Sequence, residues 1–132
     1  MNKIDTTLVI GASTNPERYA YKAIKALRSH GKTVKAYGLK NGEVDGVIFE
    51  TEKIPFENIE TVTLYVGPQN QNSLMDYIIH EIQPKRIIFN PGTENPDFIS
   101  KAEKVGIYCE IACTLVLLAT GQYDDFTSSS RV

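Results

Sequence analysis

A short stretch after the first apolar run combines residue types that bind phosphate. The sequence GASTNPER occupies positions 11–18 and follows the strand-like residues Leu8 to Ile10. Gly11 permits a tight turn directly after a strand. Backbone amides at a helix start lack internal partners and, with the helix dipole, form an anion site. The loop therefore predicts a phosphate site, although Asn15 as a simple helix cap and Arg18 as a solvated residue would explain it too.

The same loop departs from the glycine fingerprint of dinucleotide-binding proteins. That fingerprint, G-x-G-x-x-G, would place glycines where Ser13 and Pro16 stand. NAD enzymes also place an Asp or Glu at the end of the second strand, whereas this chain has Gly38-Leu39-Lys40. A lysine there argues against NAD and favours a nucleotide with an extra ribose phosphate, as in NADP and coenzyme A. Lys40 could equally be an ordinary surface lysine that binds no phosphate.

Basic residues are concentrated near this loop. Overall, 14 Lys and Arg stand against 16 Asp and Glu, for a formal net charge of −2, which argues against a nucleic-acid binder. A local positive field suits a small ligand that carries phosphates. Positions 18–40 contain no Asp or Glu and seven basic residues, which are Arg18, Lys22, Lys25, Arg28, Lys32, Lys35 and Lys40.

Strand-like and helical segments alternate along the chain. Apolar runs at 8–10, 33–39, 61–66, 86–89 and 107–111 predict strands, and a further short strand is conceivable at 47–49. Helices are expected from Asn15-Pro16 to Gly31, at 70–83, from Asn95-Pro96 to Gly106, and at 114–120. This order predicts an α/β fold, a Rossmann-like three-layer α/β/α arrangement with a five-stranded, mainly parallel sheet.

Loop-forming residues follow three of the predicted strands. They are Gly11 onward, Gly67-Pro68 and Asn90-Pro91-Gly92. Ligands of parallel α/β sheets bind at the carboxyl ends of the strands. We therefore expect these three loops to converge on one crevice.

The ordered set of strand ends resembles a known family. Val9-Ile10-Gly11-Ala12-Ser13 with Pro16 and Arg18, the segments 63–68 and 86–92, Gly46 and Gly106-Ile107 are similar to the coenzyme-A-binding domain. That domain occurs in the alpha subunit of succinate–CoA ligase, in nucleoside-diphosphate-forming acyl-CoA synthetases and as stand-alone bacterial proteins of this length. The resemblance covers residues 5–121.

The resemblance implies roles for particular residues. It assigns the coenzyme A phosphates to the first loop, the adenosine to the end of the second strand, and a place beside the cofactor to the loops after the third and fourth strands. The residues of the first loop are Gly11, Ala12, Ser13, Thr14 and Arg18, and the residue at the end of the second strand is Lys40. The loop after the third strand contributes Val66, Gly67 and Pro68, and the loop after the fourth strand contributes Asn90, Pro91 and Gly92. The family usually has an Asn-Pro turn where this chain has Gly38-Leu39-Lys40, so the adenosine contacts depart from the pattern.

Neither catalytic nor metal-binding residues are expected. The family's ligases use a phosphorylated histidine in a further domain, and His30 and His80 both lie in predicted helices rather than at strand ends. Cys109 and Cys113 offer too few ligands for a metal site. They fit small buried thiols, although disulfide exchange with the coenzyme A thiol is chemically open to them. Glu110, a charge in an apolar stretch, is expected to face the crevice or pair with a lysine.

We therefore expect non-covalent binding of coenzyme A or an acyl-CoA, with a carrier, sensor or regulatory role through a protein partner or a homodimer. The rival hypotheses are an NADP-dependent oxidoreductase, a small CoA-thioester enzyme that uses Glu110 or Cys109, and an assembly subunit without ligand. Residues 1–126 are expected to form the domain and residues 127–132 a flexible tail. The sequence has no secretory signal and no apolar run long enough to span a membrane, which predicts a cytoplasmic protein.

Overall fold

The structure, a computed structural model, describes residues 5–126. Strands and helices alternate over this range. A 3-10 helix (η1) and a π-helix (η2) flank the second α-helix. In chain order the elements are β1 (Thr6–Ile10), α1 (Tyr19–Ser29), β2 (Val34–Tyr37), β3 (Glu43–Val44), β4 (Val47–Glu50), β5 (Ile59–Leu64), η1 (Pro68–Asn70), α2 (Asn72–Asp76), η2 (Tyr77–Ile82), β6 (Arg86–Phe89), α3 (Pro96–Lys104), β7 (Tyr108–Ile111) and α4 (Thr114–Ala119).

The strands form one sheet in the order β3-β4-β2-β1-β5-β6-β7. Every neighbouring pair is parallel except β3 with β4. The predicted Rossmann-like α/β class is confirmed, but the predicted count of five strands is wrong. Residues 43–50 form an additional hairpin around Asp45 and Gly46, whose φ angles are 49° and 82°. Positive φ at both turn positions matches the twist of a two-residue hairpin, which is why Asp-Gly is favoured there.

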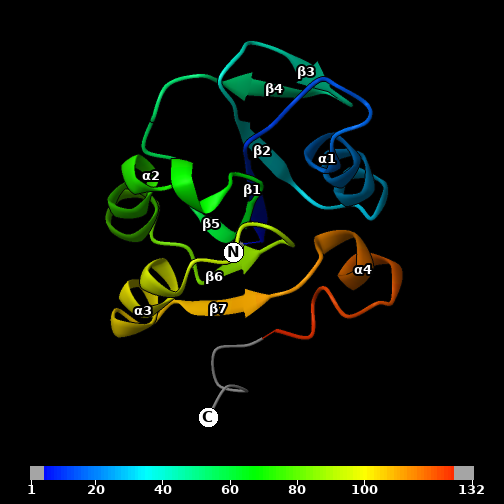
Figure 1. Ribbon diagram of the computed structural model, residues 1–132. Helices are drawn as coiled ribbons and strands as arrows, with labels where there is room; N and C mark the ends of the chain where they lie inside the picture. Colours follow the sequence, from blue (N-terminus) through cyan, green and yellow to red (C-terminus); the bar gives the residue numbers. More distant parts are fainter. Residues whose placement is uncertain (1–4, 127–132) are drawn as a thin grey trace.

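Helices cover both faces of the sheet. In Figure 1, α1 and α4 lie on one face, and α2 and α3 lie on the other. Two apolar clusters fill the layers between them. One contains Leu8, Ile10, Leu64 and Phe89 with the α2–η2 and α3 side chains, and the other contains Val9 and Ile88 with the α1 and α4 side chains. Both faces of the central strands are therefore buried, as their continuous apolar runs require.

Helix α1 begins later than predicted. Asn15 does not cap it, because Asn15 Oδ1 accepts a hydrogen bond from Glu17 N at 3.0 Å and so closes a separate turn. Arg18 is the N-cap residue and Tyr19 the first helical one. The predicted end is confirmed, because Gly31 takes a φ of 75° and its amide donates to Arg28 O.

The later elements lie close to their predicted ranges. The cap at Asn95 is confirmed by the bond from Phe98 N to Asn95 Oδ1 at 3.3 Å. On α3, Phe98 and Ala102 are buried, whereas Val105, the C-cap residue after the helix, is exposed. The predicted tail at 127–132 lies outside the described residues. None of the helices within residues 5–126 has the length and apolar character needed to cross a bilayer.

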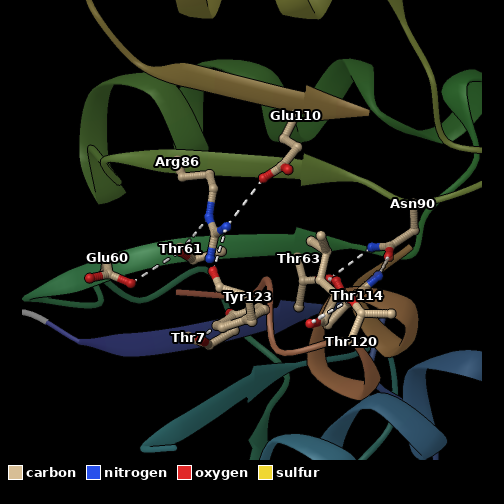
Figure 2. A network of polar contacts seen from close by, with 11 residues as sticks. Thr7, Glu60, Thr61, Thr63, Arg86, Asn90, Glu110, Thr114, Thr120 and Tyr123 are labelled. Carbon is tan, nitrogen blue, oxygen red and sulfur yellow. Dashed lines mark hydrogen bonds and ion pairs between the residues drawn. The ribbon is translucent and has the colours of Figure 1, made fainter. Parts of the chain in front are cut away.

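A buried arginine joins β6 to β7 and to the segment after α4. Figure 2 shows its guanidinium between Thr61 and Glu110. Arg86 is 1% exposed, donates to Thr61 Oγ1 at 3.0 Å and Tyr123 O at 3.0 Å, and pairs with Glu110 at 3.2 Å. Its guanidinium also lies 4.5 Å from the centre of the Tyr123 ring. Glu110 thus pairs with an arginine, not with the lysine that the sequence suggested.

A second buried polar cluster lies at the carboxyl ends of the strands (Figure 2). The Asn90 amide donates to Thr63 Oγ1 at 2.7 Å and to Leu64 O at 2.9 Å, and Asn90 Oδ1 accepts from Thr114 N at 2.9 Å. One side chain thereby connects β6 to β5 and to the first residue of α4. Because Asn90 is only 2% exposed, its hydrogen bonds replace those it would make with water.

Replacing Asn90 with Ala is expected to lower the free energy of unfolding by about 2–4 kcal/mol, because its buried hydrogen-bond partners would be left unsatisfied. Chemical denaturation measures the change. Asn72→Ala, at an exposed position on α2, is the matched control and should stay within about 0.5 kcal/mol of the parent. Equal stabilities for the two variants would contradict the assigned role of Asn90.

Candidate ligand cleft at the carboxyl ends of the strands

A cleft of about 1090 Å³ opens at the carboxyl ends of β1, β2 and β5. This volume is slightly above the range of about 300–1,000 Å³ that is usual for small-molecule sites. Its lining comes from the loop after β1, the end of β2, β4, the turn after β5 and the start of α2. The residues are Gly11, Ala12, Ser13, Thr14, Asn15, Glu17, Arg18, Tyr19, Ala20, Tyr37, Gly38, Leu39, Lys40, Asn41, Phe49, Tyr65, Val66, Gly67, Asn70, Ser73 and Leu74.

Two glycines allow the first loop to lie against both neighbouring strand ends. The amides of Gly11 and Ala12 donate to Tyr37 O at 2.9 and 3.0 Å. A Cβ atom on Gly11 would lie 2.7 Å from Tyr65 O, and one on Gly38 would lie 2.7 Å from Ala12 O. A side chain at either position would therefore push the loop away from its neighbours.

The tip of this loop lines the cleft and contains two backbone amides without an acceptor among the described residues. Ser13 Oγ accepts from Asn15 N at 3.0 Å, which holds the turn in place. Within residues 5–126, the amides of Ser13 and Thr14 have no hydrogen-bond acceptor. The first amides of α1, an 11-residue helix, begin just beyond the loop. Free amides beside a helix N-terminus favour an anionic group.

Two basic side chains border the same cleft. Arg18 comes from the cap of α1, and Lys40 follows β2. Both are exposed, and neither takes part in an ion pair within the described part of the chain. Glu17 is the one acidic side chain among the lining residues, so the ionisable groups there favour negative charge in a ligand.

Apolar side chains from the end of β2, the start of α1 and β4 also line the cleft. Leu39 is 91% exposed and Tyr19 is 64% exposed, although both are large and hydrophobic. Phe49 on β4, which is buried, lies deeper in the lining. An apolar rim over a buried aromatic ring suits a flat organic group such as a nucleobase.

Tyr65 lines the cleft, and its hydroxyl lies near Thr63 and Thr114. Burial raises its pKa to about 12, and contacts with the hydroxyls of Thr63 and Thr114 offset part of that shift. The phenol therefore keeps its proton at neutral pH and remains a hydrogen-bond donor. It connects the cleft to the Asn90 cluster behind it, which also contains Thr63 and Thr114.

The structure brings eight of the twelve predicted site residues together. The other four do not line the cleft. Pro68 begins η1 next to Gly67. Asn90 is committed to the buried cluster, and Pro91 and Gly92 are exposed beside it. The eight that line the cleft are Gly11, Ala12, Ser13, Thr14, Arg18, Lys40, Val66 and Gly67.

Several residues that line the cleft were not predicted from the sequence. Phe49 belongs to the hairpin that was not counted among the five strands. Asn70, Ser73 and Leu74 lie at η1 and α2, a segment that the sequence predicted only as a helix. The Asp45-Gly46 pair was the available signal for the hairpin.

The histidines and cysteines lie outside the cleft lining. His30 caps the carboxyl end of α1 and His80 is exposed on η2. Burial, followed by the nearby Glu103, raises the pKa of Cys109 to about 12, so this thiol is protonated at neutral pH. Cys113 is half-buried at the start of α4. Across residues 5–126, no three His, Cys, Asp or Glu side chains gather in a way that could hold a metal ion.

Comparison with known families gives one match. A family model described as a CoA binding domain matches residues 5–119. Comparison with curated proteins gives no match.

Solved structures with the same fold were also found. An uncharacterized protein is 45% identical, with a TM-score of 0.87, over 92% of this chain and 99% of its own. A hypothetical protein from Pyrococcus horikoshii OT3 is 30% identical, with a TM-score of 0.73, over 83% of this chain and 78% of its own. A conserved hypothetical protein from Pyrococcus furiosus, at 24% identity and a TM-score of 0.74 over 85% of this chain and 97% of its own, shows the fold alone.

Gly38→Ala tests the packing that forms the cleft. Its added Cβ would meet the Ala12 carbonyl, so we expect displaced amide resonances at residues 11–15 and about 2 kcal/mol less stability. Gly31→Ala is the control, because nothing lies within 4 Å of its Cβ position and only its φ of 75° opposes alanine. That change should cost about 1 kcal/mol and leave the loop resonances unmoved. Unchanged loop resonances in Gly38→Ala would contradict the packing described here.

Proposed function

The chain belongs to the CoA binding domain family, and on this basis we propose that its cleft binds coenzyme A or an acyl-CoA non-covalently. We further propose that binding serves a carrier, sensor or regulatory role, exercised through a protein partner, rather than catalysis. The observation that carries the proposal is the free pair of amides at Ser13 and Thr14, which lies beside the start of α1 and next to Arg18.

The pyrophosphate of coenzyme A fits this corner. Backbone amides and a helix N-terminus stabilise negative charge without requiring flexible side chains to become ordered. Arg18 adds a charged donor at the same end of the helix, and a cation there is otherwise unfavourable for the helix dipole. A bound phosphate would remove that conflict. The roles proposed for Gly11 and Ala12 are conformational, because both amides are already bonded to Tyr37 O.

The adenosine fits the β2 side. Leu39 and Tyr19 would cover the faces of the adenine, and their exposure would fall on binding. Lys40 follows Leu39 and lies within reach of a ribose phosphate in that arrangement. The pantetheine arm would then pass over Val66 and Gly67, which line the cleft after β5.

The lining residues support a role without catalysis. They include no histidine or cysteine, and their ionisable groups are arginine, lysine, glutamate and tyrosine. Glu110, which a thioester enzyme could have used, is engaged with the buried Arg86 instead. NADP remains the competing ligand class because it also carries a ribose phosphate.

The first test combines a ligand series with a charge reversal in the phosphate corner. Coenzyme A should raise the melting temperature, since a ligand at 100 times its Kd adds about 2.7 kcal/mol to stability. Ser13→Glu should abolish that increase by placing a carboxylate at the free amides. Ser100→Glu, on the exposed face of α3, is the control and should retain it. An undiminished increase in Ser13→Glu would remove the first loop from the site, and a larger increase with NADP would favour a reductase.

The second test asks whether Lys40 binds the ribose 3′-phosphate. Lys40→Ala should weaken coenzyme A binding by about tenfold, equivalent to about 1.4 kcal/mol, through loss of one charge-assisted contact. Binding of dephospho-coenzyme A should be the same in the parent and the variant. Isothermal titration calorimetry with both ligands measures the difference. Equal losses for the two ligands would assign Lys40 to another group of the cofactor.

A further inference from the structure

A fully buried glutamine lies beside the cleft without lining it. Gln71 is 0% exposed and is the N-cap residue of α2. Its neighbours in the chain, Asn70, Ser73 and Leu74, line the cleft, whereas Gln71 itself does not. Glutamine is mostly exposed in proteins, because burial of its amide costs free energy unless hydrogen bonds inside the protein replace those to water. The side chain of Gln71 therefore requires partners inside the protein.

Each polar atom of the Gln71 side chain has such a partner. Nε2 donates to Val66 O and to Thr93 O, both at 2.8 Å. Oε1 accepts from Asn95 Nδ2 at 3.0 Å. The two bonds from Nε2 use both N–H groups of the amide. An oxygen in place of Nε2 would face two carbonyls, so these partners also determine which way the amide is oriented.

These hydrogen bonds join two loops that follow neighbouring strands. Val66 follows β5, whereas Thr93 and Asn95 follow β6, and the two strands pair in parallel. Within residues 5–126, the carbonyls of Val66 and Thr93 have no hydrogen-bond donor other than Gln71. Loss of this side-chain amide would therefore leave both carbonyls without a donor from the described part of the chain.

The loop after β6 is anchored in the core. Thr93 N and Thr93 Oγ1 donate to Asn90 O at 2.9 and 2.8 Å, and the Asn90 side chain belongs to the buried polar cluster. Thr93 is buried, whereas Val66 is half-buried and lines the cleft. Gln71 thus connects a lining residue of the cleft to a loop that the core holds in place.

We propose that Gln71 is a positioning residue for ligand binding, which fixes the turn after β5 where that turn forms the cleft wall. It contacts no ligand and acts through the Val66 carbonyl. The inference rests on the proposed function, in which the pantetheine arm passes over Val66 and Gly67. A wall that is ordered before binding lowers the entropy cost of association. Gln71 should therefore affect binding of the pantetheine arm and leave binding of the adenosine end unchanged.

The adenosine end of the proposed site is held without Gln71. The first loop is hydrogen-bonded to Tyr37 O, on the opposite side from the turn after β5. Within the described residues, neither this loop, at 11–18, nor the end of β2, at 38–40, has a hydrogen bond to residues 66–70. A ligand that lacks the pantetheine arm should therefore bind equally well whether or not Gln71 is present.

The first experiment compares two ligands by isothermal titration calorimetry. Coenzyme A contains the pantetheine arm, and adenosine 3′,5′-bisphosphate lacks it. Gln71→Met keeps the length of the side chain but removes its donors, so coenzyme A should bind about tenfold more weakly, equivalent to about 1.4 kcal/mol. The bisphosphate should bind to this variant as tightly as to the parent. Gln71→Glu, which keeps the acceptor for Asn95 Nδ2 and loses the donors, should show the same difference between the ligands.

Thr7→Val is the control for a general loss of stability. It removes a buried hydrogen bond to Tyr123 Oη at 2.6 Å, near the amino end of β1 and so at the end of the sheet opposite the cleft. Both ligands should bind to it as they bind to the parent. Equal weakening of the two ligands in the Gln71 variants, or no weakening of either, overturns the proposal.

A measurement on the parent chain does not require any variant to fold. The side-chain amide resonances of Gln71 should shift when coenzyme A binds and stay in place when the bisphosphate binds, because only the pantetheine arm reaches the turn at Val66. Equal shifts with both ligands, or no shift with coenzyme A bound, overturn the role of Gln71 while the proposed function stands. A parent chain that binds neither ligand overturns the proposed function instead, so the two failures are distinguishable.

Discussion

The close approach of the first loop to the ends of β2 and β5 is the constraint on which the cleft depends. Gly11 and Gly38 have no side chains, so the loop backbone lies against Tyr65 O on one side while its own Ala12 carbonyl meets β2 on the other. Two hydrogen bonds, from the amides of Gly11 and Ala12 to Tyr37 O, hold the loop in this position. The next two residues, Ser13 and Thr14, line the cleft, and their amides have no acceptor within the described residues. Backbone donors held in this way need no rearrangement to meet an anion.

The carboxyl edge of the sheet is divided between the cleft and a buried polar cluster. Polar residues near β1 and β2 face the cleft, whereas those near β5, β6 and α4 bond to one another around Asn90. Tyr65 belongs to both groups, because its ring lines the cleft and its hydroxyl lies near Thr63 and Thr114. The Asn90 cluster thereby supports the back wall of the cleft. At the other end of the sheet, Arg86 anchors the segment after α4 through Tyr123.

How far sequence reasoning succeeded depended on whether the signal was local. Continuous apolar runs predicted the buried strands well, and β6 has its predicted bounds from Arg86 to Phe89. The start of α1 was missed because Asn15 caps a turn at Glu17 instead of the helix. A short strand was considered at 47–49, but its partner β3 was missed because two residues, Glu43 and Val44, are too few to show a period. Asn90 was assigned to the ligand because a polar residue at a strand end looks the same whether it binds a ligand or the core.

By itself, the sequence determined the layered α/β architecture and the membership of a coenzyme-A-binding family, and it predicted the first loop as an anion site. These follow from apolar periodicity, glycine and the ordered strand ends, all of which are properties of neighbouring residues. Only the tertiary structure decided which strand ends meet, that Phe49 and Leu74 complete the cleft, and that Asn90 and Glu110 face inward. Such outcomes depend on sheet order and side-chain direction, which arise from packing between segments far apart in the chain.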